Sequence, residues 1–398
     1  QRLALRQVFE IRLCPPLGAG VGIGDVLGSG IGRGIRHLSY SNQGGRPDGV
    51  QVMVNRGHVY VGHMFSDGVT ILDAADPRRL KPVGFYTAGT NTRTHHLQVS
   101  GDVMLLANGA NIIAMQSYDN LRGYFENALV DSITNRKKFR SGLSIHDISK
   151  PGEMREIAFL EIPGFGINRL WWTGGRYAYV SAHFDGFTDH ILCIVDLQNI
   201  TKPEIVSRWW LPGMNRAAGE KPTAPQGKRY ALHHMITAGN RGYAAWRDGG
   251  FTVHDISDAH NPKLLSHINW SPPYPGGTHT PLPLPGRKLA LVADEANAEK
   301  CAKGTFCTFV VDLRAEEKPV TIATLPTPKE REYILAIARH NIPVACVAAG
   351  IIALVVSVAR LVLPQSNEVA GGLTGIAVGC VFFGLAWLIR RGTVPPSW

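Results

Sequence analysis

The stretch Val69-Thr-Ile-Leu-Asp73, followed by Lys81-Pro82-Val83, decides the fold, because the same pattern returns along the chain. In this pattern an apolar strand ends in Asp, and a turn that contains proline leads into the next strand. Asp can accept hydrogen bonds from the backbone of the turn, while proline fixes φ and ends the strand pairing. The pattern recurs as Leu143-Ser-Ile-His-Asp147 with Lys150-Pro151, as Cys193-Ile-Val-Asp196 with Lys202-Pro203, as Phe251-Thr-Val-His-Asp255 with Asn261-Pro262, and as Phe309-Val-Val-Asp312 with Lys318-Pro319.

Upstream of each Asp lies a hairpin with a glycine turn between two apolar strands, as in Val50–Val54 and His58–Val61 around Asn55-Arg56-Gly57. One unit thus supplies about four short strands every 50–70 residues, which is typical of propeller blades. We therefore expect an all-β chain: a β-propeller of about five recognisable blade units over residues 46–328, after a Gly-rich extension at 1–45. The sequence leaves open whether these units close into a ring or form an incomplete one. The second unit carries a long insertion, Ala110–Ser141, for which a lid or an interface element is expected.

The composition changes abruptly after Pro328. Ile342–Ala359 and Val369–Ile389 are uncharged stretches of 18 and 21 residues, long enough or nearly long enough to cross a bilayer as helices. We predict a two-helix transmembrane hairpin over residues 335–390, with a buried soluble hairpin as the alternative. The positive-inside rule then predicts a membrane protein with its propeller on the cytoplasmic side. The charges behind this prediction are Lys329, Arg331, Arg339, Arg390 and Arg391 at the outer ends of the hairpin, against Arg360 near its turn.

The net charge of +10 does not indicate a nucleic-acid partner, because the basic residues are scattered and the longest run is Arg136-Lys137-Lys138. No nucleotide cofactor is expected either, since no G-x-G-x-x-G spacing can be placed on the glycines at 18–34. The six cysteines are spread over the chain and do not form a disulfide framework.

Histidines occupy equivalent positions of several repeats. When the units are aligned on their glycine hairpins, the start of the first strand carries Thr94-His95-His96, Ile167-Asn168-Arg169, Leu232-His233-His234 and Gly277-Thr278-His279. The innermost strands of a propeller surround one axis, so equivalent residues of different blades are expected to converge there. The candidate metal ligands at the starts of first strands and the ends of second strands are His63, His95, His183, His233, His234 and His279, with Asp294 and Glu295 nearby.

Imidazoles together with a carboxylate suit Zn, Cu or non-haem Fe. A single histidine at a strand end is more often a hydrogen-bonded structural residue, and no H-E-x-x-H or paired C-x-x-C motif supports a metal site. Tyr230 and Arg247 could orient an anionic ligand, but each is equally plausible as a surface residue.

The chain resembles the bacterial LVIVD-repeat proteins, which implies a propeller over about residues 37–328. Relatives of that kind continue into further blades, so the resemblance implies a propeller truncated before its last blades and fused to the membrane hairpin. The hairpin itself is somewhat similar to small subunits of tripartite tricarboxylate transporters. The resemblance rests on Gly44-Gly-Arg-Pro-Asp-Gly-Val-Gln-Val-Met-Val54, Trp210-Leu-Pro-Gly-Met-Asn215, Tyr230-Ala-Leu-His-His234, Asn269-Trp-Ser-Pro-Pro273, and Gly277-Thr-His279 with Val292-Ala-Asp-Glu295.

Three hypotheses about function remain open at this point. The first is a membrane-tethered propeller that binds a small-molecule ligand or a protein partner at its histidine-rich face, with or without a metal. The second is a metal-dependent oxidase or hydrolase, distantly like the selenium-binding and methanethiol-oxidase propellers. The third is a non-catalytic scaffold that uses blade edges and the insertion, so the sequence leaves open whether the protein is an enzyme.

Overall fold

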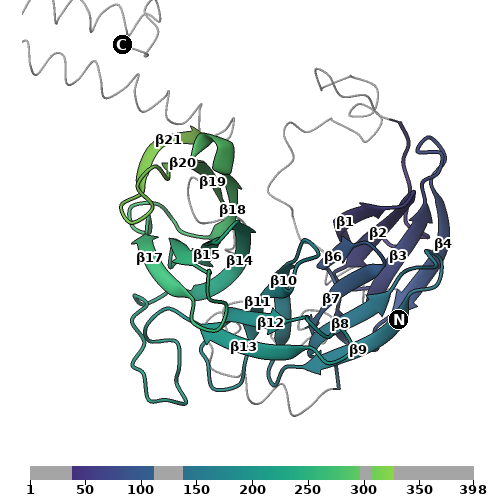
Figure 1. Cartoon of the computed structure of the whole chain (residues 1–398), viewed down its shortest axis with the longest axis horizontal. Coiled ribbons are helices and arrows are strands. Elements are labelled where there is room, and N and C mark those ends of the chain that lie inside the picture. The colour runs from purple at the N-terminus through teal and green to yellow at the C-terminus, as the bar shows by residue number, and fades with distance from the viewer. Residues whose placement is uncertain (1–37, 112–137, 296–306, 327–398) are drawn as a thin grey trace, which may run out of the picture. The chain divides into compact units, whose positions relative to one another are not determined.

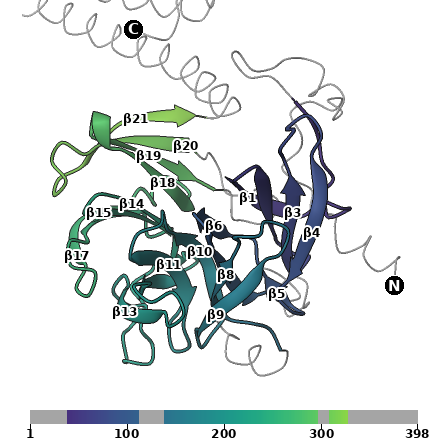
Figure 2. The ribbon, with the colours of Figure 1, turned by 45° about the vertical axis from the view of Figure 1, so that its right-hand side comes forward.

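The computed structural model describes residues 38–111, 138–295 and 307–326, and in these ranges the chain is all β. Apart from one short 3-10 turn, Pro285–Arg287, each regular element described is a strand. The strands form five successive antiparallel meanders of four, which we call blades 1 to 5 (Figures 1 and 2).

The strands follow one another in chain order within each blade. Blade 1 holds β1 (Gly49–Asn55), β2 (His58–His63), β3 (Gly68–Asp73) and β4 (Lys81–Thr87). Blade 2 holds β6 (Leu97–Ser100), β7 (Val103–Ala110), β8 (Gly142–Asp147) and β9 (Arg155–Glu161), with the short β5 (Thr92–Arg93) also paired to β7. Blade 3 holds β10 (Gly166–Trp171), β11 (Tyr177–His183), β12 (Ile191–Asp196) and β13 (Glu204–Trp209). Blade 4 holds β14 (Tyr230–Ala238), β15 (Arg241–Arg247), β16 (Phe251–Asp255) and β17 (Lys263–Ile268). Blade 5 holds β18 (Thr278–Leu284), β19 (Leu289–Asp294), β20 (Cys307–Asp312) and β21 (Val320–Pro326).

The repeated Asp ends the third strand of every blade and shapes the turn that follows. In each case its carboxylate accepts a hydrogen bond from the backbone N–H two residues further on, at 2.8–2.9 Å. This short local bond turns the chain toward the outer strand, and the mechanical role predicted for the Asp is confirmed. The five residues are Asp73, Asp147, Asp196, Asp255 and Asp312.

Neighbouring blades contact one another through their first strands. β1 packs against β6, β6 and β7 against β10, β10 against β14, and β14 against β18. Single residue pairs, Gly166 with Gly109 and Arg247 with Thr278, also join β10 to β7 and β18 to β15. Contacts between successive first strands are the neighbour relation of propeller blades, so the propeller-type architecture predicted from the repeats is confirmed.

The hydrophobic core lies between the faces of adjacent blades. Tyr60 and Ile71 of blade 1 pack with Leu97 and Met104 of blade 2, and another cluster joins blades 4 and 5. The third strands of blades 1 to 4 are almost wholly buried, whereas the outer strands are half-buried or exposed. Burial is therefore greatest in the second and third strands of blades 1 to 4, where apolar and β-branched side chains fit a pleated, covered surface.

Two further predictions concern the insertion in blade 2 and the C-terminal hairpin. Most of the insertion at 110–141 and the whole predicted hairpin at 335–390 lie outside the described residues. Within the described ranges, no helix has the length and apolar character needed to cross a bilayer. The predicted localisation, at a membrane with the propeller on the cytoplasmic side, is therefore wrong: it was drawn from the hydropathy of the C-terminal stretches and from the basic residues around them, and the described ranges contain no candidate span.

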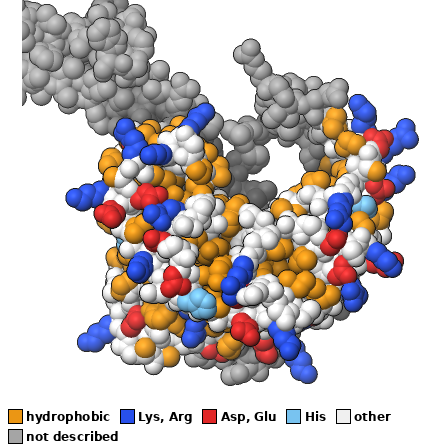
Figure 3. Space-filling model, in the orientation of Figure 1, with side chains coloured by type: hydrophobic (Ala, Val, Ile, Leu, Met, Phe, Trp, Pro, Cys, Tyr) orange, Lys and Arg blue, Asp and Glu red, His pale blue; other side chains and the backbone are white. Residues whose placement is uncertain are grey.

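Basic and acidic side chains are interspersed on the face seen in Figure 3. Several of them are paired across strands of one blade, such as Arg155 with Asp147 and Arg176 with Asp196. Mixed charges of this kind give no extended positive surface on that face.

Candidate functional site

The first strand of every blade is irregular at the same place, and this irregularity builds the site. In four blades the pairing of the first two strands shifts register near the start of the first strand, which marks a bulge. In blade 2 the first strand is instead divided into β5 and β6 around Thr94–His96, and both parts pair with β7. A bulge re-aims a side chain that regular alternation would direct elsewhere. The shifts lie between Gly49 and Gln51, Ile167 and Arg169, Tyr230 and His234, and Thr278 and Thr280.

Five imidazoles from these irregular segments form a continuous series, which we call the histidine row. The ring centroids are 6.3 Å apart between His95 and His96, 5.3 Å between His96 and His234, and 6.4 Å between His234 and His233. His233 and His279 stack at 3.6 Å with 27° between their planes. The row therefore gathers side chains from blades 2, 4 and 5 that are up to 184 positions apart in the sequence, since it runs from His95 to His279.

The histidine row is electrically neutral at physiological pH. Burial lowers the pKa of His95, His96 and His233 well below the usual value, and the positive charge of a neighbouring arginine lowers it further. For His234 and His279 the pKa falls to about 3, again mainly through burial. A neutral imidazole keeps the lone pair that a metal ion requires.

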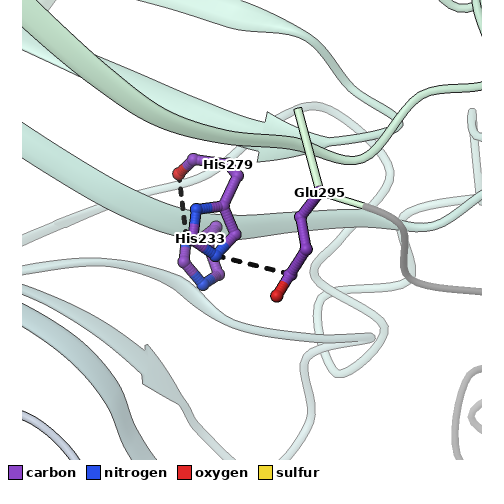
Figure 4. A group of neighbouring side chains, drawn as sticks. All are labelled: His233, His279 and Glu295. Carbon is purple, nitrogen blue, oxygen red and sulfur yellow. Dashed lines mark hydrogen bonds and ion pairs between the residues drawn. The ribbon is translucent and has the colours of Figure 1, made fainter. Parts of the chain in front are cut away.

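His233, His279 and Glu295 form a group whose ligand atoms all lie within 4.8 Å of one another (Figure 4). The Nδ1–H of His233 donates to the backbone carbonyl oxygen of His279 at 2.8 Å. Because a carbonyl can only accept, this contact fixes the tautomer and leaves the lone pair of His233 on Nε2. Nδ1 of His279 lies 2.7 Å from the hydroxyl of Thr280, so its Nε2 is also left toward the group.

The carboxylate of Glu295 completes the group. Its Oε2 lies 3.4 Å from Nε2 of His279 and also accepts a hydrogen bond from Nη1 of Arg247. Burial raises the pKa of Glu295, but the positive charge of Arg247 and the hydrogen bond from Arg247 outweigh this effect and hold that pKa below its usual value. The carboxylate is therefore ionised at neutral pH, and with an exposed fraction of 45% it meets solvent.

The geometry fits a small divalent ion. Two ligands of a tetrahedral ion with bonds of about 2.1 Å stand roughly 3.4 Å apart, and this is the distance between His279 Nε2 and Glu295 Oε2. Hydrogen bonds from the ligand imidazoles to backbone and hydroxyl oxygens are the outer-shell contacts that such sites use. Two imidazoles and a carboxylate leave at least one coordination position for water or substrate.

The remaining predicted ligands lie outside this group. His63 is buried and committed to its own blade, with Nδ1 3.0 Å from Asp48 and Nε2 2.7 Å from Thr70. His95 and His234 belong to the histidine row at other points. His183 ends β11, where its Nδ1 accepts from the N–H of Phe165 at 3.3 Å, and Asp294 ends β19. The prediction of one shared ligand set was therefore broader than the group that the structure brings together.

A second cluster, which the sequence reasoning did not identify, lies beside His183. Nδ1 of His190 lies 2.7 Å from Oδ1 of the buried Asp189, and Asp189 also accepts from Nε of Arg229 at 2.5 Å. The rings of His183 and His190 are 5.8 Å apart. The only sequence indication was the pair Asp189-His190 itself, because it lies between β11 and β12 and outside the aligned strand starts.

Comparison with known proteins gives one match to a family. Residues 237–269 match the LVIVD repeat. This segment runs from the end of β14 through β17, so the predicted repeat type is confirmed at blade 4. Neither the match nor the structure supports the truncated end and fused hairpin that the resemblance implied, and no curated protein matches the chain.

Solved structures with a similar course of the chain share very little sequence. A protein from Lactobacillus plantarum is 12% identical with a TM-score of 0.49, covering 70% of this chain and 72% of its own. A hypothetical selenium-binding protein from Sulfolobus tokodaii is 12% identical with a TM-score of 0.45, covering 69% and 66%. The designed Ika8 protein is 10% identical with a TM-score of 0.41, and the alignment covers 69% of this chain and 61% of Ika8. At such identities the chemistry of a site does not transfer.

Proposed function

We propose that this protein is a metal-dependent enzyme in which His233, His279 and Glu295 hold one divalent transition-metal ion. The observation that supports the proposal is the spacing of 3.4 Å between His279 Nε2 and Glu295 Oε2, with His233 stacked on His279 and its Nε2 lone pair available. Both imidazoles are neutral, so no proton has to leave them before a metal binds.

Each ligand is oriented by a neighbour of its own. The backbone carbonyl of His279 holds the ring of His233, the hydroxyl of Thr280 holds the ring of His279, and Arg247 holds the carboxylate of Glu295. Bound there, the metal would act as a Lewis acid and lower the pKa of a coordinated water molecule. The half-exposed Glu295 marks the side from which solvent and a small substrate reach the group.

The reaction class follows from the metal that the site selects. Two histidines and a carboxylate hold zinc in hydrolytic sites and iron(II) in oxygen-dependent sites. The proposal therefore covers a hydrolase with zinc and an oxidase with iron, and the identity of the bound metal decides between them.

Metal binding by the full chain is the test. Protein stripped with EDTA is titrated with Zn²⁺, Fe²⁺ and Co²⁺ by calorimetry, and the Co²⁺ form is followed by its visible absorption. We expect one ion per chain, and at least 100-fold weaker binding in His279→Ala and Glu295→Gln. His260→Ala removes an exposed imidazole at the blade 4 turn and should bind as the wild type does.

Failure to bind any of these ions stoichiometrically, or unchanged affinity in His279→Ala, would refute the proposal. Turnover is then followed with small esters and small thiols, each with the preferred metal and with chelator. Ester hydrolysis that depends on zinc supports the hydrolase, and thiol oxidation that depends on iron and oxygen supports the oxidase.

A further inference from the structure

Three arginines surround the histidine row. Arg169 lies on β10 at the position that carries histidine in blades 2 and 4, Arg93 lies on β5, and Arg247 ends β15. Arg169 is close enough to add to the lowering of the pKa of His96, His234 and other imidazoles of the row, after the larger effect of burial. The arginines therefore come from three blades but face a common region.

The positive charge of Arg169 is not compensated by the neutral imidazoles around it. Its Nη1 is buried and has no hydrogen-bond acceptor among the residues that the structure describes. Among the described residues, Glu295 is the one carboxylate whose charge raises the pKa of Arg169, and Glu295 already accepts a hydrogen bond from Arg247. A buried donor without an acceptor is unfavourable, and so is a buried positive charge whose neighbouring carboxylate already pairs with another arginine.

The pKa of Arg169 agrees with a buried guanidinium that lies near other positive charges. Burial, and then the charges of Arg93 and Arg247, lower the pKa of Arg169 to about 9. The guanidinium is nevertheless still protonated at neutral pH. A charged group kept in such an unfavourable place is characteristic of a functional site rather than of a stabilising contact.

We propose that Arg169, flanked by Arg93 and Arg247, binds an anionic group of a small molecule, either a carboxylate or a phosphate. A guanidinium presents a planar set of donors that matches both groups, so the anion would supply the acceptor that Nη1 lacks. That this anion belongs to the substrate of the metal centre rests on the proposed function, whereas the binding itself does not.

Calorimetry at constant ionic strength provides the test, with inorganic phosphate and malonate as the two probes. The full chain is treated with EDTA so that no metal contributes. We expect one saturable site in the wild type, at least tenfold weaker binding in Arg169→Gln, and partial recovery in Arg169→Lys. Arg155→Gln removes an exposed arginine of β9 and should bind as the wild type does. The probe that binds with the higher affinity identifies the preferred anion, phosphate or carboxylate.

Thermal unfolding gives a second, independent readout. Because Arg169 is unfavourably placed without an anion, Arg169→Gln should melt at the same temperature as the wild type or higher in chloride. Phosphate or malonate should raise the melting temperature of the wild type and leave that of Arg169→Gln unchanged.

Absence of saturable binding of both anions, equal binding by Arg169→Gln, or a marked loss of stability in that variant would each overturn the inference. His279→Ala separates the two proposals. If this variant and the wild type both fail to bind metal but still bind the anion, the proposed function fails and the anion site stands. If metal binds through His279 but neither anion does, the reverse holds.

Discussion

Acidification is expected to destabilise blade 4 through His254, which lies fully buried where blades 3 and 4 meet. The edge of its ring packs against Trp209 of blade 3, with centroids 4.4 Å apart, and its Nε2 lies 2.8 Å from the hydroxyl of Thr252. Burial, and to a lesser degree the neighbouring His267, lowers the pKa of His254 to about 3. The perturbation that isolates this residue is His254→Asn, which keeps a polar side chain but does not titrate.

The direction of the change in stability with pH follows from proton binding by His254 in the folded and unfolded states. In the unfolded chain the imidazole binds a proton below a pH of about 6.5, whereas in the folded protein it binds one only near pH 3. Stability that is complete above pH 6.5 is therefore lost as the pH falls from 6.5 toward 3. Linkage gives a loss of about 2 kcal/mol at pH 5 and about 3 kcal/mol at pH 4.

Urea unfolding between pH 4 and pH 7, followed by circular dichroism, measures this effect. At pH 7 His254→Asn should have a lower free energy of unfolding than the wild type, because packing around the imidazole is lost. Between pH 7 and pH 4 the wild type should lose about 3 kcal/mol more of its free energy of unfolding than the variant does. The other buried histidines titrate in both proteins and cancel. A difference for His254→Asn that is constant over this range would refute the reasoning.

Three further changes test the packing between and within blades by the same unfolding measurement. Arg140→Met removes a two-pronged pair in which both terminal nitrogens donate to Glu156 at 2.7 Å, and should cost about 1–2 kcal/mol, with a smaller loss in high salt. Gly142→Ala, at φ 151°, places a methyl group against a carbonyl oxygen of β9 and should cost about 2 kcal/mol. Trp209→Ala removes the ring that covers His254 and should cost about 3 kcal/mol. A change below 0.5 kcal/mol in any of them would contradict the packing described.

The blades could be predicted from the sequence because their main features are local. An Asp that bonds the N–H two residues later acts within one turn, so its recurrence marks every third strand. The same alignment placed His95, His233 and His279 at strand starts, and in the structure their rings belong to one series.

The finer composition of the site depends on contacts that the pattern does not contain. His63 has the expected position, yet Asp48 and Thr70 of its own blade occupy both of its ring nitrogens. Asp189 and His190 lie between two strands, outside the strand starts on which the units were aligned. In the alignment Arg169 occupies a position that carries histidine in other units. Its proposed role in anion binding rests on the absence of an acceptor for its Nη1 within the described part of the chain, which the sequence does not show.

The bulges at the starts of the first strands have a consequence for how this scaffold can change. Each one interrupts the pairing of the first two strands locally, and the pairs further along these two strands stay in register. A substitution at such a point changes the side chain presented to the histidine row and leaves the strand pairing beyond it in place. Blade 3 thus presents the guanidinium of Arg169 where blades 2 and 4 present imidazoles. Evolution, or a protein engineer, could thus vary the reactive side chains one blade at a time without changing the fold.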